Sequence, residues 1–412
     1  MSTADFFPTL SLAERDRRWA ALRDLMSRHG LAALAVFGTQ RDQWDRYVTN
    51  EGLHGIALIT AADDPAHLVG RFPLGRYDAP GAAYERWVDD VRIGNPAALL
   101  AAALHERGVA DGAVGIVGMS SRAVGAGAGC IPASTWQHLA SAVPKAEFVD
   151  MAVEFEMLAV VKSPEERDMI RKAAQLGEDA CDAFVSAAKP GAYESACVGA
   201  AVGAILAGGG SPFYSPYILE RSGPSRFAWG QPEWMGMGGR PRVLRRGDTI
   251  AAEIFAFYGG FESQQQIDVA LGEPIPEIRR LEEIVLDSHQ RGLAALRPGI
   301  TFAELCDTMH EPLHRAGVWN TGPLVQTVSP VMFNGATHVG TENDPGLAHL
   351  PALPPVVARD GDFTLVPGVA FAFEANALYE GHRVCLGGTV LLTEDGYEEL
   401  NSLPNRLVVV GT

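Results

Sequence analysis

The stretch GDTIAAEIFAFYGGFESQQQIDVALG, residues 247–272, begins with an apolar run that is typical of a strand buried on both faces. Glu253 lies in the middle of this run, and its neighbours on the same face of the strand, Ala251 and Phe255, are apolar. A carboxylate in such surroundings needs a metal ion, a cation or a network of hydrogen bonds, or it stays protonated. The run therefore indicates a functional site at Glu253, with a solvent-facing position on an alternating strand as the alternative.

The composition is that of a globular chain, because 47% of the residues are apolar and 20% are charged. A length of 412 residues is enough for two or three domains. No run of eighteen apolar residues occurs, and the first residues, MSTADFFPTLSLAERDRR, lack the basic and apolar regions of a signal peptide. We therefore expect a cytoplasmic protein. A net charge of -17 disfavours binding to nucleic acid or to anionic membranes, which leaves small molecules or peptides as partners.

The cysteines argue against a disulfide framework and against a thiolate zinc site. They are odd in number, scattered, and form no CxxC pair. We expect buried thiols at all five positions: Cys130, Cys181, Cys197, Cys306 and Cys385.

The first half of the chain reads as an α/β domain. Ser11-Leu-Ala-Glu14 is a capping box, and apolar residues then recur at helical spacing up to Gly30. The apolar segments LAALAVFG, HGIALITA and GAVGIVGM alternate with the helical segment ALLAAALHERG. We place this domain at residues 1–153.

The second half, residues 154–412, opens with another helix start, Ser163-Pro164-Glu165-Glu166, which predicts a helix over 163–188. The segment AAKPGAYESACVGAAVGAILAGG that follows has a counterpart 108 residues later, ALRPGITFAELCDTMHEPLHRAG. Both have a basic residue, Pro-Gly, a short turn and a helix that ends in Gly. This internal repeat predicts two similar α/β halves that face one another and share a site.

These features, with the segments LRRGDTIAAEI and LVPGVAFAFEANALYEGHRVCLGGTVLLTEDGYEEL, resemble the pita-bread superfamily, which includes creatinase, ectoine hydrolase, prolidase, aminopeptidase P and methionine aminopeptidase. The resemblance runs from Glu154 to the C-terminus. It implies an α/β (α+β) fold in which a creatinase-type N-terminal α/β domain precedes a pita-bread catalytic domain with an internal pseudo-two-fold repeat.

The resemblance also shows a departure at the metal ligands. Peptidase members bind two metal ions with two Asp eleven residues apart, one His and two Glu, and hard oxygen ligands suit such ions. The first Asp position matches Glu253, the second matches Gln264, and the two Glu positions match Glu374 and Gly387. The His position falls within NGATHVG, near His338. Two carboxylates remain of four, too little charge for a dinuclear centre, so we expect no metal and no other cofactor.

Creatinase and ectoine-hydrolase-like members of the superfamily work without metal, and the latter have Glu at the first position of the hairpin. The segment that carries the acid/base His of creatinase matches SGPSRFAWGQPEW here, where the His position falls on Trp229 or Gly230. No His lies between Leu139 and Ser288. The group that transfers the proton must therefore lie elsewhere.

Glu253, Glu374 and His338 are the candidate catalytic residues. The repeat brings Glu253 and Glu374 face to face, and two buried carboxylates close together favour one protonated acid and one ionised base. His338 lies in a Gly-rich loop, so it is either a residue of the site or an exposed residue without a catalytic role.

The candidate substrate-binding residues are polar or aromatic. Arg383 can bind a substrate carboxylate, or form a surface ion pair with Glu380. Gln264, with Gln265 and Gln266, places amides in the cavity or forms a polar strand edge. Three aromatic residues either form a wall of the substrate pocket or simply pack under a loop: Tyr214, Phe227 and Trp229. His382 is the last candidate. His310 and His314 have metal-ligand spacing, but we expect their helix on the outer face. Asn343 to Ala358, rich in Pro, predicts an irregular loop that could act as a lid.

We therefore expect a metal-independent hydrolase, creatinase-like or ectoine-hydrolase-like, that cleaves a C–N bond in a small nitrogen-containing molecule. Three alternatives stay open. They are a lyase on the same fold, a metal-dependent Xaa-Pro aminopeptidase or prolidase-like peptidase, and a non-catalytic binding domain. The resemblance also implies a homodimer in which residues from Trp44 to Gly52 reach the partner's site.

Overall fold

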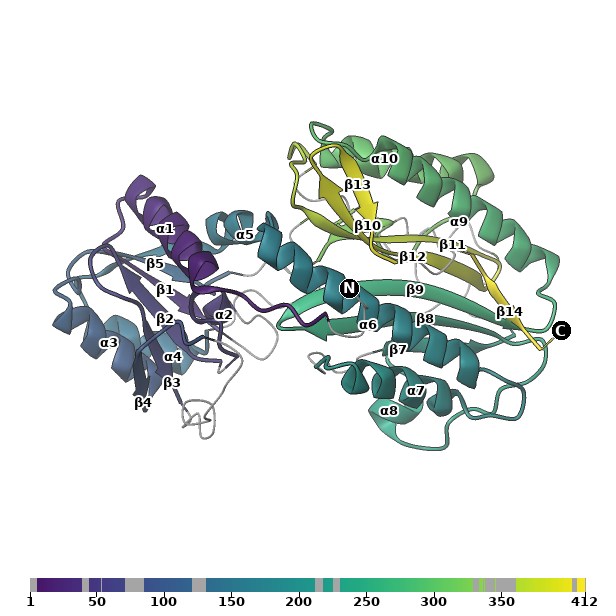
Figure 1. The fold of residues 1–412 in the computed structure, drawn as a ribbon, viewed down its shortest axis with the longest axis horizontal. Coiled ribbons are helices and arrows are strands. Elements are labelled where there is room, and N and C mark those ends of the chain that lie inside the picture. The colour runs from purple at the N-terminus through teal and green to yellow at the C-terminus, as the bar shows by residue number, and fades with distance from the viewer. Residues whose placement is uncertain are drawn as a thin grey trace. The chain divides into compact units, whose positions relative to one another are not determined.

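A computed structural model describes residues 6–38, 44–52, 54–70, 85–120, 131–211, 218–224, 230–328, 333–335, 337, 345, 361–401 and 406–411. The chain divides into two compact units, Pro8–Ala159 and Val160–Thr412, the second of which includes Met1–Phe7 (Figure 1). The sequence placed this boundary after residue 153, inside the helix Ala152–Val160. The helix belongs to the first unit because Phe155 packs edge-on against the rings of Trp44 and Tyr47.

The first unit is a mixed sheet with helices. Its strand order is β4-β3-β2-β1-β5-β6, with β1 antiparallel to β2 and parallel to β5. The strands are β1 Ala33–Phe37, β2 Ile56–Thr60, β3 Ala66–Val69, β4 Asp90–Ile93, β5 Ala113–Val117 and β6 Glu147–Asp150. The helices are α1 Leu12–Arg28, α2 Trp44–Thr49, α3 Pro96–Glu106, α4 Ala133–Ala142 and α5 Ala152–Val160. The predicted α/β character of this region is confirmed.

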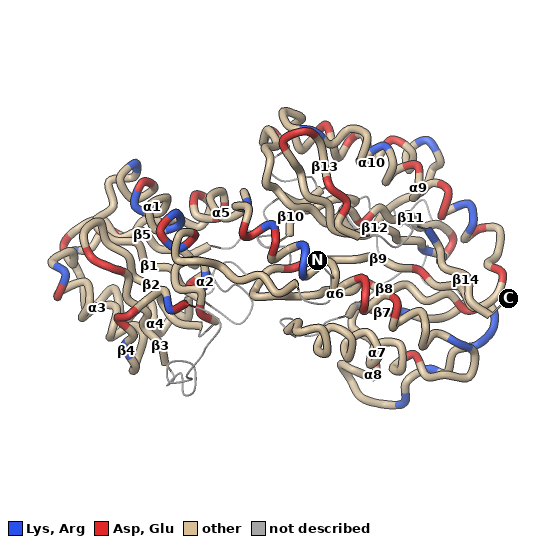
Figure 2. Tube along the Cα trace, viewed as in Figure 1, with Lys and Arg blue, Asp and Glu red and all other residues tan. Residues whose placement is uncertain are grey.

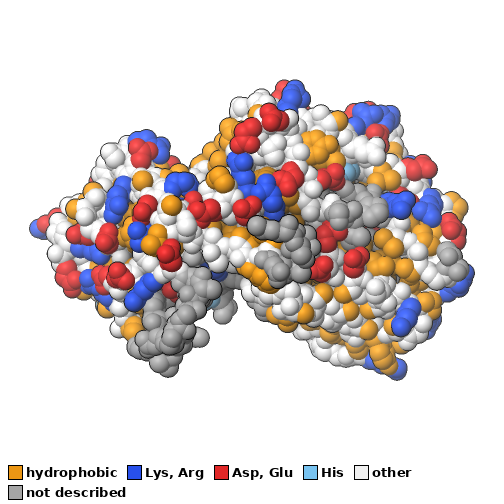
Figure 3. Space-filling model, viewed as in Figure 1, with side chains coloured by type: hydrophobic (Ala, Val, Ile, Leu, Met, Phe, Trp, Pro, Cys, Tyr) orange, Lys and Arg blue, Asp and Glu red, His pale blue; other side chains and the backbone are white. Residues whose placement is uncertain are grey.

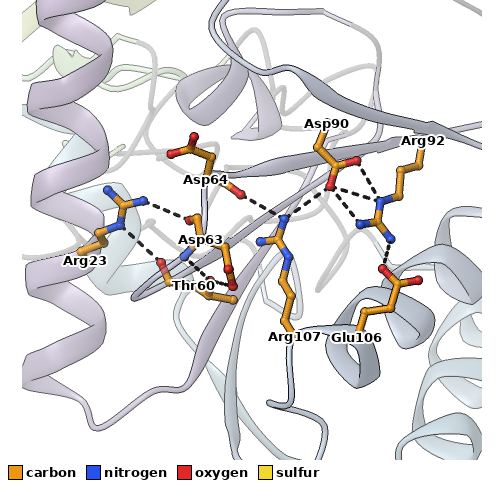
Figure 4. A network of polar contacts seen from close by, with 8 residues as sticks. All are labelled: Arg23, Thr60, Asp63, Asp64, Asp90, Arg92, Glu106 and Arg107. Atoms are coloured by element: carbon orange, nitrogen blue, oxygen red, sulfur yellow. Dashed lines mark hydrogen bonds and ion pairs between the residues drawn. The ribbon is translucent and has the colours of Figure 1, made fainter.

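A polar network links several elements of the first unit (Figure 4). Arg92 bonds both Asp90 and Glu106, and Arg107 donates to the backbone oxygen of Asp64. The Arg92 guanidinium holds the pKa of Asp90 below its usual range. Arg23 of α1 donates to the backbone oxygens of Thr60 and Asp63. These bonds link α1, β4 and α3 to the segments that follow β2 and α3.

The second unit is one eight-stranded sheet with two helix pairs. Its strands are β7 Ile218–Gly223, β8 Thr249–Tyr258, β9 Phe261–Leu271, β10 Val325–Thr327, β11 Ala370–Tyr379, β12 His382–Thr393, β13 Gly396–Glu399 and β14 Val408–Val410. Its helices are α6 Pro164–Ala187, α7 Glu194–Ala207, α8 Glu233–Met237, α9 Pro276–Ala295 and α10 Phe302–Ala316. Helix α6 begins as predicted, with Ser163 and Glu166 in a complete capping box and Pro164 at its first position.

The second unit consists of two halves in the same element order. Two helices and three strands (α6, α7, β7, β8, β9) are followed by two more helices and three more strands (α9, α10, β10, β11, β12), and the short helix α8 between β7 and β8 is an addition to the first half. The sheet order β10-β11-β12-β9-β8-β7 is symmetric about the junction of β12 and β9. Helix α6 packs on β8 and β9, and α9 packs on β11 and β12 (Figure 1). The predicted α/β fold with an internal repeat is confirmed.

Each half contains a hairpin with a two-residue turn. Tyr258 pairs with Phe261 across Gly259-Gly260, and Tyr379 pairs with His382 across Glu380-Gly381. All four turn residues have positive φ, between 50° and 87°. Such values at both central positions are those of a type I′ turn, whose twist matches that of the strands. The two hairpins therefore have the same length and the same internal register.

The strand β9 lies at the centre of this sheet. It pairs with β8 from Phe261 to Ala270, pairs with β12 at Gln266, and pairs in parallel with β14 from Val269 to Leu271. β9 is buried at every position. The alternative of a polar strand edge for its glutamines is therefore wrong.

Charges of both signs are mixed along the exposed helices. In Figure 2, Lys/Arg and Asp/Glu segments alternate on α9 and α10, where Arg291 pairs with Asp287 and Arg315 pairs with Glu311. Figure 3 shows the same mixture over the face in view, without a continuous basic area. None of the helices in the described part of the chain is long and apolar enough to cross a membrane. Four cysteines are buried free thiols, as expected, and Cys130 lies outside the described residues.

Candidate active site

Four residues form one row across the second unit's sheet. Glu253 on β8 pairs with Gln266 on β9, Gln266 pairs with Gly387 on β12, and Gly387 pairs with Glu374 on β11. Paired residues on neighbouring strands point to the same face of a sheet. The row therefore carries Glu253 and Glu374, one from each half, on one face.

That face points away from the helices. Ile250, Ala252, Ile254 and Ala256 alternate with Glu253 and pack into the core under α6 and α7. In the other half, Phe373 meets the His289 ring of α9 edge-on at 5.8 Å, which directs its neighbour Glu374 to the opposite side. Glu253 is only 4% exposed and Glu374 only 3%, so the alternative of a solvent-facing Glu253 is wrong.

The electrostatics of Glu374 are those of a carboxyl that keeps its proton. Burial raises the pKa of Glu374 well above its usual range, the charge of Glu253 raises it further, Arg383 lowers it, and Glu262 adds a smaller increase. The Oε1 atom of Glu374 is buried and has no close hydrogen-bond donor among the described residues, although a weaker hydrogen bond from the Gln326 side chain lowers the pKa of this carboxyl slightly. Two carboxyl groups that interact electrostatically, one of which has a raised pKa, are suited to work as a donor and an acceptor of protons.

Amide side chains lie beside Glu374 and along β9. Gln266 Nε2 donates to Glu374 Oε2 at 3.4 Å. Gln264 donates from Nε2 to Glu262 at 2.8 Å and accepts from Gln326 at 3.2 Å, and Asn334 donates to Gln326. Gln264 was predicted to contact substrate, but both its amide nitrogen and its amide oxygen are hydrogen-bonded to protein side chains. Gln265, between them in sequence, lies on the helix side, where it bonds Glu178 and Asn401.

A second charged group lies beside the row. Arg383 is 6% exposed and acts on the charges of both Glu374 and Asp268, so the alternative of a surface ion pair with Glu380 is wrong. Asp268 accepts a hydrogen bond from the Cys385 N–H at 2.7 Å. Burial raises the pKa of Asp268 to about 7, although that N–H and Arg383 both lower it. Sequence reasoning missed Asp268. The signal was a charged residue between Ile267 and Val269 in an apolar run.

The remaining candidates are not brought into this group by the described residues. His382 is the first residue of β12, and alternation places it on the opposite face from Arg383 and Gly387. His310 and His314 stack with ring centroids 5.8 Å apart on α10, away from the row. His338, Trp229, Phe227 and Tyr214 lie outside the described residues, as does nearly all of the segment from Asn343 to Ala358.

The residues on the row do not fit a dinuclear metal centre. The amide of Gln264 is neutral and engaged on both ends, and Gly387 has no side chain. Within the described part of the chain, no group of three or more His, Cys, Asp or Glu side chains is arranged to hold an ion. Two +2 ions need several anionic ligands, and the row offers two.

Comparison with known proteins adds the family. A hydrolase/peptidase of Sinorhizobium fredii, y4tL, is 25% identical over 414 residues, which cover 97% of each chain. The ectoine hydrolase of Halomonas elongata is 23% identical over 436 residues, covering 95% of this chain and 96% of its own. The X-Pro aminopeptidase of Thermotoga maritima has the same fold, with a TM-score of 0.73 at 20% identity, over 95% of this chain and 99% of its own.

The family model for metallopeptidase family M24 matches residues 168–394, a segment that contains both hairpins and all four positions of the row. The match covers more than half of the chain. This protein belongs to metallopeptidase family M24, a family of hydrolases and peptidases.

Proposed function

We propose that this chain is a metal-independent hydrolase that cleaves a C–N bond in a small nitrogen-containing molecule. The observation that carries the proposal is the row itself, which brings two buried carboxylates from the two halves onto one face and has an amide and a glycine at its other two positions. The similarity to ectoine hydrolase over nearly the whole of both chains also supports hydrolysis of a C–N bond in a small molecule.

In the proposed reaction Glu253 is the general base and Glu374 the general acid. Glu253 takes a proton from a water molecule as its oxygen attacks the substrate carbon. Glu374, whose raised pKa keeps it protonated, gives its proton to the leaving nitrogen as the C–N bond breaks. The Glu374 Oε1 atom supports this role because it makes no close hydrogen bond to a described protein group. Proton transfer between the two acids restores the starting state.

The competing function is a metal-dependent peptidase. A dipeptidase PepE of Mycobacterium tuberculosis is 25% identical to this chain over 255 residues, 61% of each chain. The charge on the row argues against it, because Gln264 and Gly387 take two positions at which such a peptidase needs carboxylates.

The test is a substrate screen with a metal control. Amidines, ureas, lactams, N-acyl amino acids and Xaa-Pro dipeptides are offered to the purified chain before and after a chelator, and bound metal is measured by elemental analysis. We expect turnover of a non-peptide C–N substrate, unchanged by the chelator, with well under one equivalent of Mn, Co, Zn or Fe. Stoichiometric metal that leaves together with activity would establish the peptidase instead.

A lyase on the same fold is separated by isotope labelling. A hydrolase transfers oxygen from labelled water to its product, whereas an elimination does not. Product without label would replace hydrolysis by elimination at the same pair of acids.

We also propose that the chain acts as a homodimer in the cytoplasm, with residues from Trp44 to Gly52 contributing to the partner's site. The described part of this segment carries α2, Trp44–Thr49. Light scattering at micromolar concentration tests the dimer, and a fully active monomer would exclude it.

A further inference from the structure

Gln266 reaches Glu374 across an intervening strand. Its own strand, β9, is separated from β11 by β12, so the two backbones lie about 10 Å apart at the usual strand spacing. The side chain covers this distance because the residue between them is Gly387, which has no side chain in the way. The result is the 3.4 Å contact from Gln266 Nε2 to Glu374 Oε2.

Gly387 is fixed in this role by its backbone. Its φ is +150°, and a Cβ added there would lie 1.9 Å from the backbone oxygen of Phe373. A β-carbon cannot approach backbone oxygen so closely, and the oxygen belongs to the paired strand, so neither atom can move away cheaply. A carboxylate at position 387 is therefore excluded by geometry as well as by sequence.

On this basis we propose that Gln266 takes the place of a cation in this site: its amide lies between Glu253 and Glu374, bonds Glu374 as a neutral donor, and fills the room in which an ion would sit. The inference rests on the proposed metal-independent chemistry. It assigns Gln266, which sequence reasoning considered only within the Gln264–Gln266 run, as the positioning residue of the pair.

The placement has two consequences. The bond to Oε2 orients the Glu374 carboxyl, so that Oε1 is the oxygen left for a substrate. Gln266 also stands between Glu253 and Glu374 in the row, so replacing Gln264 by a carboxylate does not by itself rebuild an ion site. An ion becomes possible when the amide of Gln266 is removed and a third carboxylate is supplied.

The first test measures Mn²⁺ binding by calorimetry and needs no substrate. Gln264→Asp is compared with the double variant Gln264→Asp/Gln266→Ala and with the matched control Gln264→Asp/Gln265→Ala. Gln265 is as buried as Gln266, at 4% and 5% exposed, but lies on the helix side. We expect the Gln266 double variant to bind Mn²⁺ at least tenfold more tightly than either of the others. Equal binding by all three, or none by the Gln266 double variant, would overturn the proposal.

A second pair of variants covers the case in which the double variant does not fold. Gln266→Glu keeps the length of the side chain and makes three carboxylates in the row, whereas Gln265→Glu adds the same charge on the other face. We expect Mn²⁺ to raise the Tm of the first variant and not of the second. A larger Tm increase for Gln265→Glu, or equal Tm values for both variants with and without Mn²⁺, would contradict the proposal that Gln266 occupies the space of an ion.

A third measurement separates positioning from plain stability once a substrate is known. Gln266→Ala should lower kcat at least tenfold with a smaller change in KM, and Gln265→Ala should leave both nearly unchanged. A loss confined to KM would mean that Gln266 binds substrate and does not position Glu374. The metal measurements stand even if no C–N substrate is found, so this inference and the proposed function can fail separately.

Discussion

The hairpins β8–β9 and β11–β12 share one backbone plan but differ in the side chains around their acids. Equivalent positions are 121 residues apart, as in Glu253 and Glu374 or Gln266 and Gly387. Both hairpins turn at a two-residue loop with positive φ, and both have a glutamate at the same number of residues before the turn. The repeated backbone thus sets the position of the two acids.

The positions around the acids are not repeated. Three equivalent pairs show the contrast: Glu262 and Arg383, Gln264 and Cys385, Asp268 and Thr389. The first hairpin supplies negative charge and amides, and the second supplies a cation, a thiol and a glycine. Symmetry therefore gives the pair its geometry, whereas the differences between the halves give each acid its own environment and, in the proposed reaction, its own role.

The largest expected effect tests whether the two glutamates work as a pair. Glu253→Gln keeps the side-chain volume but removes the proton acceptor, so we expect a loss of about 10² or more in turnover. Stability should change little or rise, because one buried charge is removed beside Glu374. Glu178→Gln, which touches Gln265 on the helix side, is the control. A variant that unfolds while its folded fraction keeps full specific activity would make Glu253 structural.

The difference between Asp268 and its counterpart Thr389 can be tested through the pH dependence of stability. The folded pKa of Asp268, about 7, lies above the value near 3.9 of an unfolded aspartate, so the fold favours the protonated form. The resulting stability is complete below about pH 4 and is lost as pH rises to about 7, by up to about 4 kcal/mol in all. Asp268→Asn keeps an acceptor for the Cys385 N–H and should flatten this dependence. Urea unfolding from pH 4 to 8 measures it, and parallel curves for the two proteins would disprove the assignment.

Gly387 tests how far the second hairpin tolerates a side chain. Gly387→Ala should cost about 3 kcal/mol or more, since it combines a positive φ with a clash against Phe373 O. Gly396→Ala has nearly the same φ, +147°, with nothing within 4 Å of the added Cβ, and should cost about 1 kcal/mol. The difference isolates the clash. Equal costs in chemical denaturation would show that β11 and β12 can separate at this point.

The smallest effect compares the capping boxes of the two halves. Ser163 and Glu166 cap α6 in a buried setting, whereas Thr301 and Glu304 cap α10 at the surface. Ser163→Ala should therefore cost about 1 kcal/mol, and Thr301→Ala less. A larger cost at Thr301, measured by thermal unfolding, would reverse the ranking.

The sequence predicted what depends on local pattern. The start of α6 at Ser163 follows from a capping box, and the two halves follow from repeated segments, because these signals lie within a few residues of one another. The prediction of a functional site at Glu253 followed from the presence of a carboxylate inside an apolar run. What could not be predicted depends on the pairing of strands far apart in the chain. Gln266 matters because it lies opposite Gly387, and Arg383 and His382 fall on different faces through the register of β12.

The pairing of β9 has a consequence for when the protein can fold during synthesis. β9 is made before its neighbours β12 and β14, and β14 lies at residues 408–410. On the ribosome the first hairpin can form early, but its buried Glu253 and Gln266 face no partner half until β11 and β12 have emerged. We therefore expect a nascent chain that stops before β11 to expose the polar face of β9 and to depend on chaperones until the second half is complete.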